Sequence, residues 1–416
     1  MHLHTSMSRI ESLIATKKIG RVPLPTAIFW LLILIAVAVT ITISPIAWDV
    51  DVYRNAIRSM QRGHDPYLDA ITTRIAYNTQ TVHPVGDPPF NYIYSPITLP
   101  LLRFIGARPI WLSGTFYWSI YIVAVLASIW VATLALEVDE QSVFFCIAPV
   151  IVFFPGLLAN GTVLGGNIAY ILYGFVLTAA AYGWKRNRWL YFYLAVISAS
   201  CIKMPLLSLV TIPILSARKQ WLPAAVTSGC GLGLFALTSV IWPELFKHYL
   251  EAINDQFLFN RDFGCSPAGF LSTALDFYGV PYSPAAIIFY IVYAVPIFTL
   301  LVILSRRYLN GLFSLNQWMP VLLAGVILLN PRIIEYDLAP ITLFMLILAW
   351  RFTSRFLKPF HAIMTLATIF IIANSIASYS WTIWKFTEGP VLIACFGVGC
   401  LTLERPQLDP AQTRPS

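Results

Sequence analysis

Long apolar blocks without a charged residue recur along the whole chain, and they restrict the possible folds more than any other feature. The first runs from Ala27 to Ser44. A helix of roughly 17–25 apolar residues crosses a bilayer while satisfying its own backbone hydrogen bonds. The 416-residue chain is 58% hydrophobic and 11% charged, whereas soluble domains contain about 25% charged residues. We therefore expect an all-α, polytopic integral membrane protein with most of its surface in the lipid bilayer.

The net charge of +8 does not indicate a nucleic-acid partner. The basic residues collect in short loops between apolar blocks, where they set the orientation of a membrane protein. The six cysteines contain no C-x-x-C pair, and the six histidines show no ligand spacing. We expect no disulfide, no metal site and no cofactor.

The basic loops define one threading of the chain through the membrane. Residues 1–26 form a cytoplasmic N-terminal segment, residues 27–403 a single membrane domain, and residues 404–416 a polar tail. The first apolar block lacks a cleavage site, so we interpret it as a retained helix. About twelve crossings follow, with both termini inside. The spans lie near 27–44, 112–136, 144–157, 167–184, 189–202, 205–216, 221–241, 284–304, 313–329, 338–352, 360–378 and 389–403.

Most polar segments are predicted to lie outside. They are residues 45–111, 159–167, 242–284 and 330–337. The first is the largest, and its apolar part, FNYIYSPITLPLLRFIG, contains Pro96, Pro100 and Arg103. These residues favour an interfacial or dipping helix over a span.

Two acids, Asp49 and Asp51, follow the first span. If the first helix continues beyond it, Asp49 and Tyr53 share one face at i and i+4. Asp51 lies on the other side, within reach of Arg54 and Arg58. Asp49 has no basic neighbour in the local sequence, and an unpaired carboxylate among apolar groups becomes a better proton acceptor near neutral pH. Asp49 is therefore the candidate general base and Asp51 the partner of an arginine.

Two alternatives remain open for these acids. Both can be interfacial residues that mark the exit of the first helix, because most exposed charges are merely solvated. If Pro45 breaks the helix before Trp48, the roles of Asp49 and Asp51 exchange.

Lys203 is the only charged residue between Trp189 and Ala217, and Pro205 follows closely. The apolar segment on each side is short, so we expect a pair of helices broken at Lys203. Broken helices with a charged residue line cavities, and an intramembrane lysine is a functional candidate. An anion such as a lipid phosphate is its natural partner. The alternative is a lysine that extends to the outer membrane surface.

Three outside loops contribute further candidates. Arg332 suits phosphate oxygens, although an Arg332–Glu335 pair at a helix start is equally plausible. Asn260 and Arg261 lie in a polar loop that either recognises sugar hydroxyls or simply joins two spans. Asn167 opens a helix after two glycines, a position that suits an anion or hydroxyl contact.

These motifs together resemble the polyprenyl-phosphate-sugar-dependent glycosyltransferases of the GT-C fold, specifically the mannosyltransferase type of glycosyltransferase family 87. The resemblance covers roughly residues 27–352. The matching positions are Asp49, Tyr53, Gly63, Pro66 and Tyr67; Tyr94 and Pro96; Asn167 in GGN; Lys203 and Pro205; Asn260 and Ser266; and Pro331, Arg332, Tyr336 and Asp337. The family has Gly-Gln-x-Asn where this chain has GGN, with Gly166 set against the glutamine, which leaves the identity of the sugar open.

The resemblance implies a sugar donor on polyprenyl phosphate and a glycolipid or glycan acceptor at the outer face of a bacterial cytoplasmic membrane. Asp49, or alternatively Asp51, would be the base of an inverting, metal-independent transfer. Lys203, Arg332 and Arg261 would bind the donor phosphate. The substrate-binding residues would be Tyr53, Tyr67, Asn167, Asn260, Ser266, Glu335 and Tyr336. The acceptor, the linkage, the lipid length and the oligomeric state stay open.

Two other classes compete with this interpretation. A secondary transporter also has about twelve spans and broken helices, but it should show inverted repeats and acids in the middle of spans. A flippase or ligase for lipid-linked glycans should have basic outside loops, and the first loop has Arg54, Arg58, Arg62 and Arg74.

Overall fold

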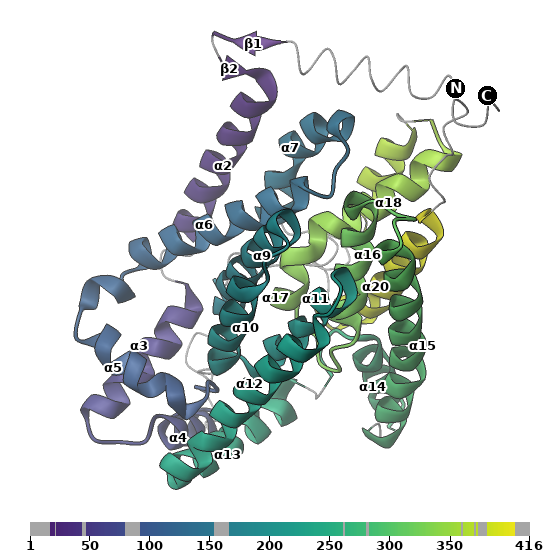
Figure 1. The fold of residues 1–416 in the computed structure, drawn as a ribbon. Helices are drawn as coiled ribbons and strands as arrows, with labels where there is room; N and C mark the ends of the chain where they lie inside the picture. Colours follow the sequence, from purple (N-terminus) through teal and green to yellow (C-terminus); the bar gives the residue numbers. More distant parts are fainter. Residues whose placement is uncertain are drawn as a thin grey trace, which may run out of the picture.

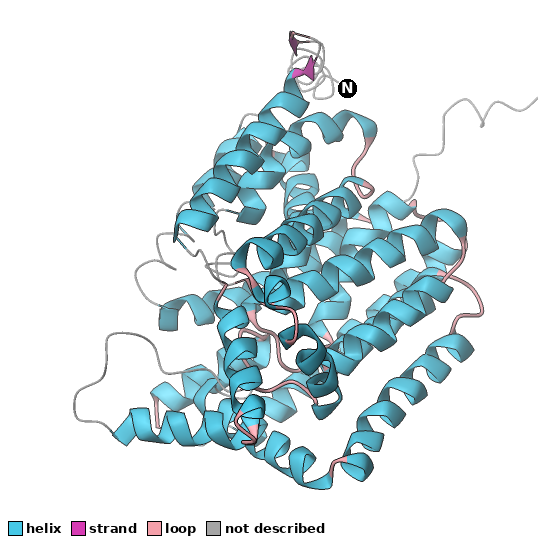
Figure 2. Ribbon diagram, turned by 90° about the vertical axis from the view of Figure 1, so that its left-hand side faces the viewer, coloured by secondary structure: helices cyan, strands magenta, loops and turns pink. Residues whose placement is uncertain are grey.

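The described chain consists almost entirely of helices (Figure 2). The computed structural model describes residues 17–20, 22–43, 47–79, 92–153, 166–260, 263–279, 283–358, 361–369, 372 and 381–403. A small antiparallel hairpin, β1 (Lys18–Ile19) and β2 (Val22–Pro23), precedes the first helix. The all-α class predicted from the sequence is confirmed for these residues.

Most of the helices follow the apolar blocks of the sequence, and the others lie in the predicted outside segments. Those of the first half are α2 (Leu24–Ile43), α3 (Trp48–Gln61), α4 (Pro66–Thr79), α5 (Leu99–Gly106), α6 (Gly114–Thr133), α7 (Val138–Phe153), α9 (Ile168–Arg186) and α10 (Leu190–Ile202). Those of the second half are α11 (Thr211–Ser216), α12 (Trp221–Ile241), α13 (Pro243–Asn260), α14 (Pro267–Phe277), α15 (Ser283–Leu309), α16 (Leu315–Leu328), α17 (Glu335–Leu338), α18 (Thr342–Phe356) and α20 (Trp381–Thr402).

Four helical segments among the described residues are long and apolar enough to cross a membrane: Gly114–Thr133, Trp221–Ile241, Pro284–Leu309 and Tyr336–Phe356. Shorter apolar helices occupy most of the other predicted spans. Residues 361–369 of the predicted span 360–378 are helical, and most of its remainder lies outside the described residues. The structure therefore supports a membrane protein, while the number of about twelve crossings stays a prediction.

The outward faces of the long helices are apolar. Ile288 and Val292 on α15 are 62% and 60% exposed, and Val226 and Val240 on α12 are also exposed. Helices that expose such side chains face lipid and not water. The predicted dipping helix forms as the short segment Pro96–Gly106, which does not reach the length of a span.

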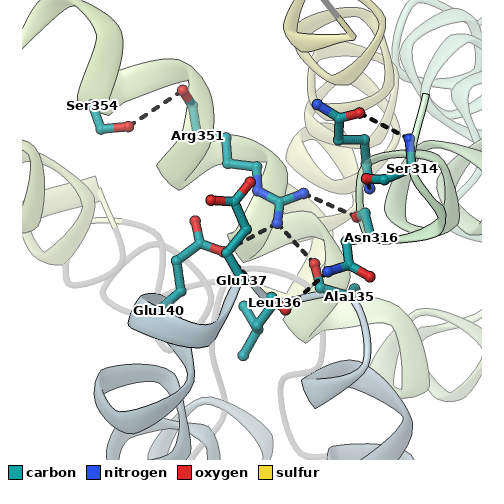
Figure 3. Close-up of polar contacts among 9 residues, drawn as sticks. Ala135, Leu136, Glu137, Glu140, Ser314, Asn316, Arg351 and Ser354 are labelled. Atoms are coloured by element: carbon teal, nitrogen blue, oxygen red, sulfur yellow. Dashed lines mark hydrogen bonds and ion pairs between the residues drawn. The ribbon is translucent and has the colours of Figure 1, made fainter. Parts of the chain in front are cut away.

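Loops that we predicted on the cytoplasmic side meet at one end of the molecule. Arg351 of α18 donates hydrogen bonds to the carbonyl oxygens of Ala135 (2.8 Å) and Asn316 (3.0 Å) and forms an ion pair with Glu140 (3.0 Å; Figure 3). The Asn316 side chain donates to the Leu136 carbonyl oxygen at 3.2 Å. These contacts join the α6–α7 turn to the start of α16 and the end of α18.

Segments that we predicted on the outer side likewise contact one another. His248 of α13 lies 2.8 Å from Asp65, which precedes α4. The backbone of Cys265 donates to the Ile333 carbonyl oxygen at 2.6 Å, which joins the third outside segment to the fourth. In Figure 1 the β1–β2 hairpin lies at the top, whereas α4 and α13 lie at the bottom. The predicted cytoplasmic segment before α2 and the predicted outside helices α4 and α13 therefore lie at opposite ends of the fold.

Candidate functional site

Asp49, in the first turn of α3, is buried with only 1% of its surface exposed. Its Oδ2 accepts hydrogen bonds from the hydroxyls of Tyr53 (3.1 Å) and Tyr94 (3.0 Å) and from the backbone N–H of Ile168 (2.9 Å). Its Oδ1 accepts a longer bond of 3.3 Å from the Asn167 side-chain amide. The carboxylate thus joins the first outside segment to the beginning of α9.

Asp51 points away from this network. Its side chain is 59% exposed and pairs with Arg54 at 3.5 Å. Residues i and i+2 of a helix point about 200° apart around its axis, so Asp49 and Asp51 of α3 cannot face the same way. The structure therefore separates them as the helical phase predicts, with Asp49 inside and Asp51 outside.

The first helix does not extend into α3 as a single described element. Helix α2 ends at Ile43, residues 44–46 lie outside the described part, and α3 begins at Trp48. In the structure Asp49 is the buried acid and Asp51 the exposed one, and the exchange of catalytic roles in the case of a break stays a prediction. The phase depends on the packing of α3 itself, which also buries Val50 and Tyr53.

Burial raises the pKa of the Asp49 carboxyl, because the charged form loses water. The Ile168 N–H, the positive charge of Lys203 and the two phenols oppose this effect in part. Burial and the charge of Asp49 also raise the pKa of Tyr53 and Tyr94 well above the usual value, so both phenols remain hydrogen-bond donors. The result is a carboxylate with increased basicity.

Lys203 lies on the other side of the Asn167 amide. Its Nζ donates to Asn167 Oδ1 at 3.2 Å and lies 3.7 Å from the centre of the Tyr336 ring. Asp337, Asp49 and Arg332 are close enough to interact with its charge. Helix α10 ends at Ile202, Lys203 is extended, and a 3-10 segment begins at Met204. The break that the sequence predicts at Lys203 is therefore present.

Asn167 lies between Asp49 and Lys203 because it begins helix α9. Its Oδ1 accepts from the N–H of Ala169 at 2.9 Å, so the side chain caps α9. The same oxygen accepts from Lys203, and its amide group donates to Asp49. The Asp49 carboxylate also lies against the positive end of α9 through the Ile168 N–H. This arrangement gives Asp49 a structural role, because it holds the beginning of α9 against α3.

Two further tyrosines hold the backbone around the network. The Tyr67 hydroxyl donates to the Tyr94 carbonyl oxygen at 2.7 Å, and the Tyr117 hydroxyl donates to the Gly166 carbonyl oxygen at 2.7 Å. The predicted contact of Tyr67 with substrate stays a prediction, and in the structure its hydroxyl donates to a backbone oxygen. Gly166 has a φ of +66° and packs against Ala47, so a Cβ at this position would overlap Ala47. A glutamine therefore does not fit where Gly166 stands in GGN.

Replacement of Gly166 by alanine is expected to destabilise the protein by about 2–5 kcal/mol. The left-handed conformation costs an alanine about 1–2 kcal/mol, and overpacking adds about 1–3 kcal/mol. Gly63→Ala is the matched control, because Gly63 has a φ of +77° and nothing within 4 Å of its added Cβ. Thermal unfolding in detergent checks this, and a Gly166→Ala midpoint no lower than that of Gly63→Ala contradicts it.

The other predicted residues do not all join the network. Ser266 is buried and caps α14 by accepting from the Gly269 N–H at 3.1 Å. The Arg332 backbone N–H donates to Asn330 Oδ1 at 3.3 Å, and its charge acts on Lys203. Arg261 and the side chains of Asn260 and Glu335 lie outside the described residues.

Sequence reasoning left Tyr94 and Asp337 out of the proposed site, although both belong to motifs that it named. Tyr94 contacts Asp49 from a segment far along the chain, which no local spacing predicts. Asp337 accepts from the Ile334 N–H at 3.1 Å at the start of α17, and its charge acts on Lys203. Within the described residues, no group of three or more histidine, cysteine, aspartate or glutamate side chains could hold a metal ion.

Comparison of the chain with protein-family models gives no matching family, and comparison with curated proteins gives no match. A buried carboxylate with increased basicity lies one amide group away from a lysine. Such a pair suits a reaction in which a proton is removed from one group while negative charge develops on another.

Proposed function

We propose that this protein is a membrane glycosyltransferase (a hexosyltransferase) that moves a sugar from polyprenyl phosphate to the hydroxyl of a glycolipid or glycan acceptor. The sugar is mannose or a similar hexose or pentose. The observation that carries the proposal is the convergence of Asp49 and Lys203 on the two ends of the Asn167 amide. The motif resemblance to family 87 enzymes of the GT-C fold supports the same assignment.

The chemistry divides between the two residues. Asp49 takes the proton of the acceptor hydroxyl, and the acceptor oxygen forms a bond to the anomeric carbon. The bond from that carbon to the phosphate oxygen breaks, and its electron pair stays on the lipid phosphate. Attack opposite the leaving group inverts the anomeric centre. Lys203 stabilises the charge on the phosphate, as positioned cations do in other transfer reactions.

The acceptor approaches the Oδ1 oxygen of Asp49. Three of the four hydrogen bonds go to Oδ2, and the contact of Oδ1 with Asn167 is the longest at 3.3 Å. Hydrogen bonds weaken with distance, so this contact is the one that an acceptor hydroxyl replaces most easily. Because Asp49 is buried, the acceptor must enter the network to react.

The membrane supplies both substrates. Apolar helices surround the site and suit a polyprenyl tail. Tyr94 connects Asp49 to Tyr67 of α4, and Asp65 before α4 contacts His248 of α13, so the network joins the end of the fold that these helices form. We assign this end to the outer face of the cytoplasmic membrane, with the Arg351 end and both chain termini inside. The assignment follows from the positions of the basic loops.

A transfer assay tests the proposal. The full-length protein in membranes should move label from radiolabelled polyprenyl-phosphate mannose to extracted lipid acceptors, and membranes with Asp49→Asn protein should not. A secondary transporter or flippase would instead move its substrate across proteoliposomes without forming a new glycoside. Transport of the substrate across the membrane without formation of a new glycoside contradicts the proposal.

A further inference from the structure

The Asn167 side chain links two oppositely charged groups that act on different substrates. Its Oδ1 accepts from Lys203 at 3.2 Å, and its amide nitrogen donates to Asp49 at 3.3 Å. The positive charge of Lys203 favours the ionised form of Asp49. In a buried site such an interaction is screened much less than in water. A change of charge at Lys203 therefore changes the proton affinity of Asp49.

We propose that binding of the donor phosphodiester at Lys203 makes Asp49 a stronger base, so that the acceptor hydroxyl is activated only when the donor is in place. The inference rests on the proposed function and adds its regulation. The bound phosphate neutralises Lys203 and brings a negative charge near Asp49. Both effects increase the affinity of Asp49 for a proton. By linkage, a proton on Asp49 favours donor binding to the same extent.

Other groups around the pair define the controls. Four phenols face Asp49: Tyr53 of α3, Tyr94 of the segment before α5, and Tyr117 and Tyr121 of α6. The start of α9, with Asn167 and Ile168, and the charge of Lys203 also act on it. Lys203 is faced by Asp49, Asp337, Arg332 and Tyr336. Asp337 is thus the other acid that responds to Lys203, whereas Asp51 lies on the exposed face of α3.

The proposal is tested with geranylgeranyl methyl phosphate, a phosphodiester that carries one charge, does not titrate near neutral pH and cannot transfer a sugar. Calorimetry on the full-length protein in buffers of different ionisation enthalpy gives the number of protons bound with the ligand. The wild-type protein should take up a fraction of a proton. Its affinity should fall about tenfold as pH rises across the titration of Asp49, since one pKa unit corresponds to a factor of ten.

Three variants decide the outcome. Asp49→Asn should lose most of the proton uptake and bind with little pH dependence, whereas Asp51→Asn should behave like the wild type. Asp337→Asn should keep most of the uptake. Two results overturn the coupling and leave the transferase proposal intact. In the first, the wild-type protein binds the ligand without taking up a proton. In the second, Asp337→Asn abolishes the proton uptake and Asp49→Asn does not. Absence of ligand binding overturns both the coupling and the transferase proposal.

Discussion

Replacement of Asp49 by asparagine is expected to lower the rate of sugar transfer by about 10²–10⁴-fold, the usual contribution of a general base. Asparagine retains an oxygen that can accept from Tyr53, Tyr94 and the Ile168 N–H. Its side chain cannot accept a proton at neutral pH. Initial rates at saturating donor measure the loss, and donor binding should remain at least as strong as in the wild type because a negative charge near the phosphate is removed.

The fold should survive this substitution. The new amide nitrogen would face the amide nitrogen of Asn167, and the loss of one such hydrogen bond costs about 0.5–1.5 kcal/mol. Against this, a neutral amide is less costly to bury than a carboxylate. Thermal unfolding in detergent should therefore give a midpoint close to that of the wild type near neutral pH.

The difference in stability between the Asp49→Asn variant and the wild type should depend on pH in a defined direction. Burial raises the pKa of Asp49, so the folded state binds this proton more tightly than the unfolded state. The contribution of Asp49 to stability is full below its unfolded pKa and is lost as pH rises through its folded pKa. The Asp49→Asn variant lacks this loss, so its stability relative to the wild type should increase with pH.

Asp51→Asn is the matched control. It changes the same type of residue two positions along α3, at an exposed site whose ion pair with Arg54 is worth about 0–1 kcal/mol. Its transfer rate should stay within a few-fold of the wild type. If both variants transfer sugar at the wild-type rate, neither acid is the base and the proposed mechanism fails.

Replacement of Lys203 by alanine is expected to weaken donor binding by about 10- to 150-fold and to slow turnover. The range corresponds to the loss of a hydrogen bond to a charged group, about 1.5–3 kcal/mol. Lys203→Arg should retain part of the affinity, because a guanidinium binds phosphate and also stacks on an aromatic ring such as that of Tyr336. Binding of the polyprenyl-phosphate sugar to both variants measures the effect.

A structural effect of the alanine must be separated from the loss of the phosphate contact. Removal of Lys203 takes a positive charge away from both Asp337 and Asp49, and buried charges that lose a partner are destabilising. Yield and thermal unfolding of Lys203→Ala should therefore be compared with those of Lys203→Arg, which keeps the charge. An alanine variant that folds and binds the donor as the wild type does would rule out the phosphate role.

Local features of the site follow directly from the sequence. The i, i+4 spacing of Asp49 and Tyr53 predicts their shared face, and the spacing of Asp51 and Arg54 permits their ion pair. An isolated lysine beside Pro205 predicts a broken helix. These features depend on neighbours within one or two helical turns, where backbone geometry fixes the direction of each side chain.

Only the tertiary structure decides which residues from distant segments contact Asp49 and Lys203. The hydroxyl of Tyr94 on Asp49 and the placement of Lys203 over Tyr336 join segments far apart in the chain. Periodicity gives the direction of a side chain relative to its own helix axis, but it does not say which other helix lies opposite.

The apolar blocks by themselves determine that the chain is helical and lies in a membrane, because backbone groups in lipid must be satisfied within each segment. They do not determine whether a polar residue between them caps a helix or enters a site. The sequence predicts a helix start at Asn167 and places Ser266 in an outside loop, and both residues cap helices in the structure. Only Asn167 also contacts Asp49 and Lys203, because the packing of α9 brings its capped end between α3 and the break after α10.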